Sequence, residues 1–172
     1  SALGLNYSDK WGKKKKVTVS SSYFFNGTKN NNTSATVRNY LSTTDSGMVY
    51  SENKEITSKN FNNRLNLRLE YAIDSSNMLT FTPSLNIQNY VANSFLNATN
   101  TTKGENVESA INNNQYTKQL GVNFSNNILY QHKFSKKGRT ISFNLNTSIN
   151  TKKSTGSLLS YNNYSVDSTW IN

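Results

Sequence analysis

The sequence has no cysteine and only one proline, Pro83, among its 172 residues. Without cysteine the chain can form neither a disulfide framework nor a thiolate metal site, so both classes of small domain are excluded. Proline has no backbone N–H, so the strand that contains Pro83 must lack one ladder bond, and a local bulge or widened spacing is expected there.

Long apolar runs are also missing. No stretch of about 18 apolar residues occurs, so the sequence predicts no transmembrane helix. Apolar residues make up 34% of the chain, below the roughly 45–50% of ordinary domains, a figure that counts glycine. Low hydrophobicity with a net charge of +10 can indicate disorder. The 12% aromatic content and the regular alternation described next argue against disorder.

The stretch 60–90 alternates between apolar and polar residues. From Phe61 to Ile73 every second residue is apolar except Asn63, and the residues between them are polar or charged, apart from one alanine. A period of two is typical of a strand with two unlike faces. Residues 74–77 supply turn chemistry, after which the alternation resumes. Each arm exceeds the five or six residues of an ordinary strand and is long enough for the roughly 9–11 residues of a membrane-crossing strand.

The same pattern recurs along the chain. The sequence predicts an all-β fold, an antiparallel meander of long hairpins, as one segment of a transmembrane β-barrel covering residues 1–172. The predicted hairpins are at 1–26, 60–90 and 118–150. Short turns are predicted at 9–16, 74–77 and 135–138, and long polar loops at 27–59, 91–117 and 151–163. Residues 36–41 and 48–55 have weak strand character, so strand extensions in these stretches are an open alternative. Short turns on one side and long loops on the other are typical of outer-membrane barrels.

Basic and aromatic residues are placed in a consistent way. Nine of the nineteen basic residues lie at two short turns, namely Lys10, Lys13, Lys14, Lys15, Lys16, Lys133, Lys136, Lys137 and Arg139. They suit anionic headgroups, and solvated turns explain them equally well. Aromatic residues lie near the short turns (Tyr7, Trp11, Tyr71, Phe134) and far from them (Tyr23, Phe25, Phe61, Tyr90). These two predicted rows, about ten residues apart on a strand tilted by 45°, would be separated by about 23 Å.

Two runs of residues resemble those of a known family. The runs RLNLRLEYAIDSSNMLTFTPSLNIQ and KKGRTISFNLNTSIN resemble the outer-membrane β-barrel domain of the TonB-dependent-receptor-like proteins of Bacteroidota. The resemblance implies a polar face toward the barrel lumen, periplasmic short turns and extracellular long loops. This sequence has no plug domain and no energy-coupling box, and its six expected strands are fewer than the 22 of such transporters. The chain is therefore interpreted as a segment of a larger barrel.

The resemblance also implies partners and a location. The location is the bacterial outer membrane. The partners are outer-membrane lipid, the remainder of the chain's own barrel and plug, a periplasmic energy-coupling protein and a surface lipoprotein. The residues expected to face lipid are Leu65, Leu67, Leu69, Leu79, Phe81, Leu85 and Ile87.

Arg64, Arg68 and Glu70 share the polar face of one predicted strand and are the lumen-facing candidates. They are interpreted either as a charged patch that steers solute or contacts a plug, or as a structural cross-strand network, which we favour. The only histidine, His132, lies beside a basic turn, where an interfacial role is expected.

No residue pattern points to catalysis. The carboxylates form no pair suited to acid–base chemistry, and there is no phosphate-binding loop, nucleophile motif or metal-ligand spacing. We therefore predict no enzyme, no catalytic residue, no cofactor and no metal. Nucleic-acid binding is disfavoured, because the basic residues lie at turns rather than along one strand face.

A soluble cell-surface β-sandwich that binds glycans or protein is the alternative. In a sandwich the apolar faces of two sheets pack against each other and become buried. In a barrel the apolar face contacts lipid. The environment of the apolar face therefore separates the two hypotheses.

Overall fold

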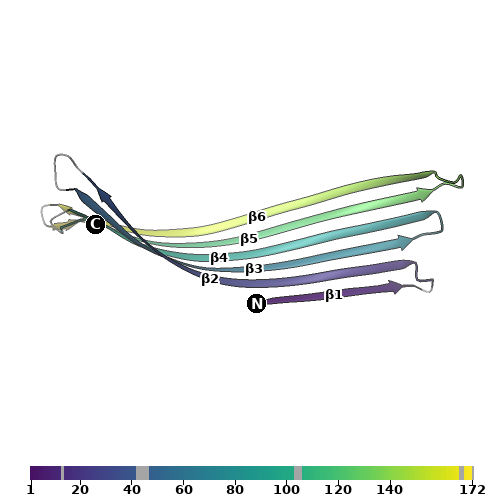
Figure 1. Ribbon diagram of the computed structural model, residues 1–172, viewed down its shortest axis with the longest axis horizontal. Coiled ribbons are helices and arrows are strands. Elements are labelled where there is room, and N and C mark those ends of the chain that lie inside the picture. Colours follow the sequence, from purple (N-terminus) through teal and green to yellow (C-terminus); the bar gives the residue numbers. More distant parts are fainter. Residues whose placement is uncertain (13, 42–46, 103–105, 167–168, 172) are drawn as a thin grey trace. The chain divides into compact units, whose positions relative to one another are not determined.

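A computed structural model describes residues 1–12, 14–41, 47–102, 106–166 and 169–171. These residues form one antiparallel sheet whose strands follow the order of the chain (Figure 1). The strands are β1 (Ala2–Trp11), β2 (Val17–Tyr40), β3 (Met48–Ala72), β4 (Asn77–Thr102), β5 (Val107–Lys133), β6 (Thr140–Val166) and β7 (Thr169–Ile171). The predicted all-β meander is confirmed, and within the described residues the sheet is open rather than closed.

The chain divides into two compact units. Unit 1 comprises residues 1–28, 60–89 and 119–153, and unit 2 comprises residues 29–59, 90–118 and 154–172. Both units draw on β2 to β6. All the hairpins predicted from alternation have most of their residues in unit 1.

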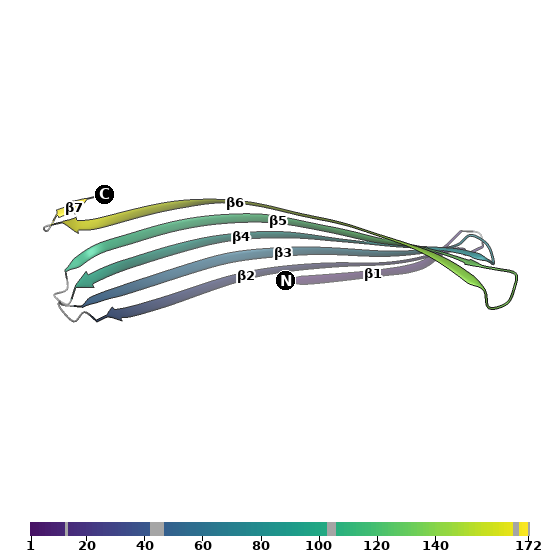
Figure 2. The ribbon, with the colours of Figure 1, turned by 90° about the horizontal axis from the view of Figure 1, so that it is seen from above.

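Short turns join β1 to β2, β3 to β4 and β5 to β6 in unit 1. Figures 1 and 2 show β1 to β6 side by side in chain order. Backbone bonds connect the ends of neighbouring hairpins, from Ala72 N to Lys16 O (2.9 Å) and from Lys133 N to Ser76 O (2.8 Å). The predicted short turns at 9–16, 74–77 and 135–138 therefore lie along one border of this unit.

The strands are longer than predicted. Residues expected in long loops at 27–59, 91–117 and 151–163 are mostly strand, because β2 continues to Tyr40, β3 begins at Met48 and β6 extends to Val166. Hydrophobic alternation detects a strand only where one face is apolar. The added residues are rich in Asn, Ser and Thr on both faces, so their pairing leaves no periodic signal. Residues 42–46 and 103–105, also in those predicted loops, lie outside the described residues. β4 runs unbroken through Pro83, and the bulge or widened spacing expected there stays a prediction.

The register places the apolar residues of neighbouring strands together. In the pairing of β1 with β2, Leu3 is opposite Phe25 and Leu5 is opposite Tyr23. Directly opposed residues in antiparallel strands point to the same side of the sheet. The odd positions of both strands therefore form one apolar face.

Unit 1 has almost no core. Val19 is the only buried apolar residue among its described residues, with 3% of its surface exposed. No described side chain in either unit is fully buried. The backbone ladder and one layer of side chains on each face therefore hold the sheet together.

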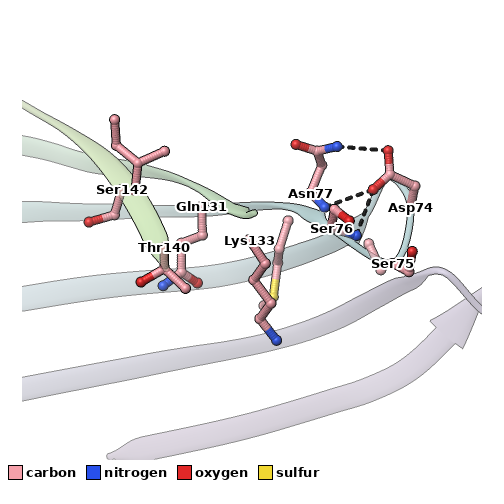
Figure 3. A pocket seen from close by; sticks show the side chains of 11 residues that line it. Asp74, Ser75, Ser76, Asn77, Gln131, Lys133, Thr140 and Ser142 are labelled. Atoms are coloured by element: carbon pink, nitrogen blue, oxygen red, sulfur yellow. Dashed lines mark hydrogen bonds between the residues drawn. The ribbon is translucent and has the colours of Figure 1, made fainter. Parts of the chain in front are cut away.

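Asp74 organises the turn between β3 and β4. Its Oδ1 accepts hydrogen bonds from the backbone N–H groups of Ser76 (2.7 Å) and Asn77 (2.8 Å), and its Oδ2 accepts one from Asn77 Nδ2 (2.7 Å) (Figure 3). Aspartate favours turns because its short carboxylate reaches these nearby donors. The Asn77 side chain, followed by the Ser76 amide, lowers the pKa of Asp74.

We predict that Asp74→Ala destabilises the sheet at neutral pH, because two turn amides lose their acceptor. A carboxyl group with a lowered pKa contributes stability that is present above its unfolded pKa and is lost as the pH falls through its folded pKa. The difference between wild type and Asp74→Ala should therefore be constant above about pH 4 and shrink at lower pH. Denaturant unfolding across this pH range measures it. A difference that does not change with pH would contradict the role of the carboxylate.

Candidate functional site

The apolar face of unit 1 is largely uncovered. Leu65 in the middle of the sheet is 43% exposed, and Phe143 on β6 is 64% exposed. The predicted lipid-facing residues on β3 and β4 all occupy odd positions of their strands, so they share this face. Leu65 is exposed, and the others are half-buried by their neighbours, namely Leu67, Leu69, Leu79, Phe81, Leu85 and Ile87. Within the described residues no second layer packs on them.

Aromatic side chains on this face form contacts at two positions along the strands, one near the short turns and one far from them. Close to the short turns, Trp11 Nε1 donates a hydrogen bond to Tyr7 OH (3.2 Å). The rings of His132 and Phe134 also meet there edge to face, with their centroids 4.7 Å apart. His132 therefore contacts a residue of this row, and the interfacial role expected for it stays a prediction.

At the position far from the short turns, the rings of Phe25 and Phe61 stack with centroids 6.3 Å apart. Gly27 permits this arrangement, because a Cβ at residue 27 would lie 3.1 Å from the Phe61 ring. The prediction placed Tyr90 in this row. Tyr90 instead belongs to unit 2 and holds an even position of β4, on the face opposite Leu85 and Ile87.

Asn63 and Asn126 are both asparagines on the apolar face, and they differ in their surroundings. Asn63 Oδ1 accepts a hydrogen bond from Tyr23 OH (2.7 Å) across the strand pair. Asn126 Oδ1 is buried and has no hydrogen-bond partner among the described residues. A buried oxygen without a partner carries its full desolvation cost, whereas a bonded oxygen does not.

The polar face carries a series of side-chain hydrogen bonds that link neighbouring strands. Asn66 bridges three strands, because its Nδ2 donates to Ser22 Oγ (3.3 Å) and its Oδ1 accepts from Ser84 Oγ (2.8 Å). Ser8 Oγ and Ser20 Oγ are 3.3 Å apart, so β1 is joined to β2 in the same way.

The series continues toward β6. Gln88 Nε2 donates to Asn60 Oδ1 (3.0 Å), and Asn127 Nδ2 donates to the carboxamide oxygens of Asn144 and Asn146. Short amide and hydroxyl side chains thus link neighbouring strands while leaving the face polar, although Asn86 Oδ1 is buried there without a partner among the described residues.

Three of the hollows that the described residues form lie on this polar face. The one of about 320 Å³ beside the short turns is lined by the 74–77 turn and by Lys133, Gln131, Thr140 and Ser142 (Figure 3). A second lies at Thr82, Asn127 and Asn146, and a third at Asn6, Ser22 and Arg68. Their linings offer hydroxyl, amide and cationic donors. The arrangement can therefore hold polar or anionic groups.

Arg64, Arg68 and Glu70 lie together on the polar face of β3 as predicted. Arg68 and Glu70 form an ion pair through Nε (2.8 Å) and a terminal nitrogen of the guanidinium. This ion pair lies within β3, because residues two apart on one strand point the same way, and the favoured cross-strand network stays a prediction. The side chains of Arg68 and Glu70 are 59% and 29% exposed, so solvent screens the pair. Arg64 is exposed, with no ion-pair partner among the described residues.

Sequence reasoning missed a cluster in unit 2. Tyr50 OH donates to Glu52 Oε2 (2.5 Å), and the Arg38 guanidinium carbon lies 5.9 Å from the Tyr50 ring centroid. The Glu52 bond, with burial next in importance, raises the pKa of Tyr50. The Tyr-Ser-Glu spacing puts Tyr50 and Glu52 on one face. The position of Arg38 depends on the pairing of β2 with β3, which the sequence of this polar stretch does not reveal.

Within the part of the chain that the structure describes, no three His, Asp or Glu side chains gather as a potential metal site. Helices with the length and hydropathy of a membrane-spanning segment are absent from the same residues. The sequence matches no family model and no curated protein.

We predict opposite effects for substitutions of Asn126 and Asn63 on the apolar face. Asn126→Val removes an unpaired oxygen and should leave stability unchanged or raise it by about 1 kcal/mol. Asn63→Val leaves the Tyr23 hydroxyl without its acceptor and should cost about 1–2 kcal/mol. Reversible unfolding in detergent micelles compares them. Tyr23→Phe is the control, because it should remove most of the cost of Asn63→Val. Equal losses at both positions would refute the distinction.

Proposed function

We propose that this chain is a segment of a bacterial outer-membrane β-barrel, in a receptor or transporter that takes up large solutes. The observation that carries the proposal is the uncovered apolar face of a single antiparallel sheet, with one aromatic row near the short turns and one far from them. In water such a face would be costly, because soluble monomers rarely expose apolar patches beyond a few hundred Å². In lipid it is the expected surface.

The dimensions of unit 1 support the proposal. On β3, Phe61 and Tyr71 belong to the two rows and are ten residues apart. At about 3.3 Å per residue and a tilt of about 45°, they are separated by about 23 Å along the membrane normal. The apolar band of outer-membrane barrels is about 25 Å tall.

The backbone supports it as well. Lipid offers no hydrogen bonds, so strands can cross a membrane only when each has a neighbour on both sides. β2 to β5 meet this condition. Among the described residues, β6 has only the short β7 on its outer side, paired at Tyr164–Val166. The remainder of the barrel is therefore the partner that the outer edges of β1 and β6 require.

The polar face suits a lumen. It carries the amide and hydroxyl network and the three hollows, together with Arg64 and the Arg68–Glu70 pair. Uptake of large solutes, a plug, a periplasmic energy-coupling protein and a surface lipoprotein rest on the resemblance of the sequence to TonB-dependent-receptor-like barrels. The single-layer sheet and the scarcity of buried apolar residues weigh against the soluble sandwich.

We predict that Leu67→Arg destabilises the protein by about 2–4 kcal/mol in a lipid bilayer, because Leu67 lies midway between the aromatic rows. Asn66→Arg is the matched control, at the same depth on the opposite face. Its cost should be about 1 kcal/mol, from the two exposed hydrogen bonds that Asn66 loses. Folding equilibria in vesicles measure both variants. Equal costs would argue against the assignment of the two faces.

We also predict that the isolated chain is not a monodisperse monomer in detergent-free buffer, because it has open strand edges and an uncovered apolar face. Light scattering with and without detergent is the measurement. A monomer in plain buffer that fails to bind an apolar dye would overturn the membrane proposal and favour the soluble sandwich.

A further inference from the structure

The short-turn border of unit 1 is strongly basic. We call its described cations the basic rim, and all are exposed, namely Lys10, Lys14, Lys15, Lys16, Lys133, Lys136, Lys137 and Arg139. Lys13 belongs to the same run but lies outside the described residues. The rim comes from two turns that are far apart in the chain.

Hydrogen bonds bring these turns into one border. Lys16 Nζ donates to Ile73 O (2.5 Å), and Lys133 N donates to Ser76 O (2.8 Å), so the 74–77 turn connects the two basic turns. Six strands about 4.8 Å apart make this border about 24 Å wide. The cations therefore lie on one border in two groups, with the 74–77 turn between them.

Carboxylates offset only part of the positive charge of the basic rim. Its two acidic residues are Asp9 and Asp74. Asp9 accepts hydrogen bonds from Tyr7 OH (3.2 Å) and Lys10 N (2.7 Å), and Asp74 is occupied by its own turn. Among the described residues the only ion pair joins Arg68 to Glu70, and it includes no residue of the rim. The eight described cations outnumber these two carboxylates, and this excess of positive charge attracts anions at a distance.

The aromatic row lies next to the rim. Trp11 and Tyr7 precede the first basic turn, and His132 and Phe134 flank Lys133 at the second. Rings of this type settle at the boundary between hydrocarbon and headgroups. Cations one to five residues further along the chain then reach the headgroup layer.

We propose that the basic rim binds the headgroups of anionic phospholipids in the membrane leaflet that the short turns face. This inference rests on the proposed function, since only a membrane-embedded unit 1 holds the rim at headgroup depth. Headgroup binding by the basic rim would make the chain prefer anionic lipids, and an apolar face alone does not provide this preference. Lys14, Lys15, Lys136 and Lys137 are the main contacts, because they extend from the turns themselves.

The test measures incorporation of the chain into vesicles by flotation, with pure phosphatidylcholine compared with a 7:3 mixture of phosphatidylcholine and phosphatidylglycerol. The wild type should prefer the anionic vesicles, and salt should weaken the preference. The rim variant carries Lys14→Gln, Lys15→Gln, Lys136→Gln and Lys137→Gln. It should lose the preference by about tenfold or more, given roughly fivefold per surface lysine.

The matched control removes the same charge from unit 2, with Lys29→Gln, Lys54→Gln, Lys59→Gln and Lys118→Gln. It should keep the preference, and circular dichroism should show equal β content in both variants. Inorganic phosphate at matched ionic strength should not release the chain, whereas release would mean that the rim recognises free phosphate instead.

The remaining outcomes separate the two proposals. Equal incorporation of the wild type into both vesicle types would overturn the headgroup inference and leave the membrane proposal standing. Equal loss in the rim and control variants would also overturn it, because net charge alone would then explain the effect. Failure to enter either vesicle would overturn both proposals.

Discussion

The antiparallel backbone ladder is the interaction on which the rest of the structure depends. With Val19 as the only buried apolar residue described in unit 1, side-chain burial cannot be what fixes the strands. Each strand from β2 to β5 instead exchanges backbone hydrogen bonds with two neighbours. The ladder keeps apolar side chains on one side and polar side chains on the other, because successive residues point to opposite faces.

The two faces then use different means of stabilisation. On the polar face, carboxamide and hydroxyl groups pair across strands, as Asn66 does with Ser22 and Ser84. On the apolar face, contacts between aromatic rings link neighbouring strands, as between Phe25 and Phe61. Asn63 shows that the apolar face tolerates a polar group when an opposing hydroxyl satisfies it.

Sequence reasoning recovered what depends on alternation. It predicted the all-β meander, the positions of the short turns and the shared face of Arg64, Arg68 and Glu70, because position along a strand determines each of them. It did not recover the full length of β2 to β6, since residues such as those from Lys29 to Tyr40 are polar on both faces. It also missed Arg38 against Tyr50, which depends on strand register in a stretch without an apolar pattern.

Chain-order pairing has a consequence for how such a sheet can change in evolution. β2 and β5 run in opposite directions, with the β3–β4 hairpin between them. If that hairpin were deleted, β2 and β5 would still meet as antiparallel neighbours with their apolar sides aligned. An inserted hairpin would likewise leave the direction of every other strand unchanged. The hairpin, rather than the single strand, is therefore the unit by which this architecture can grow or shrink without reversing a face.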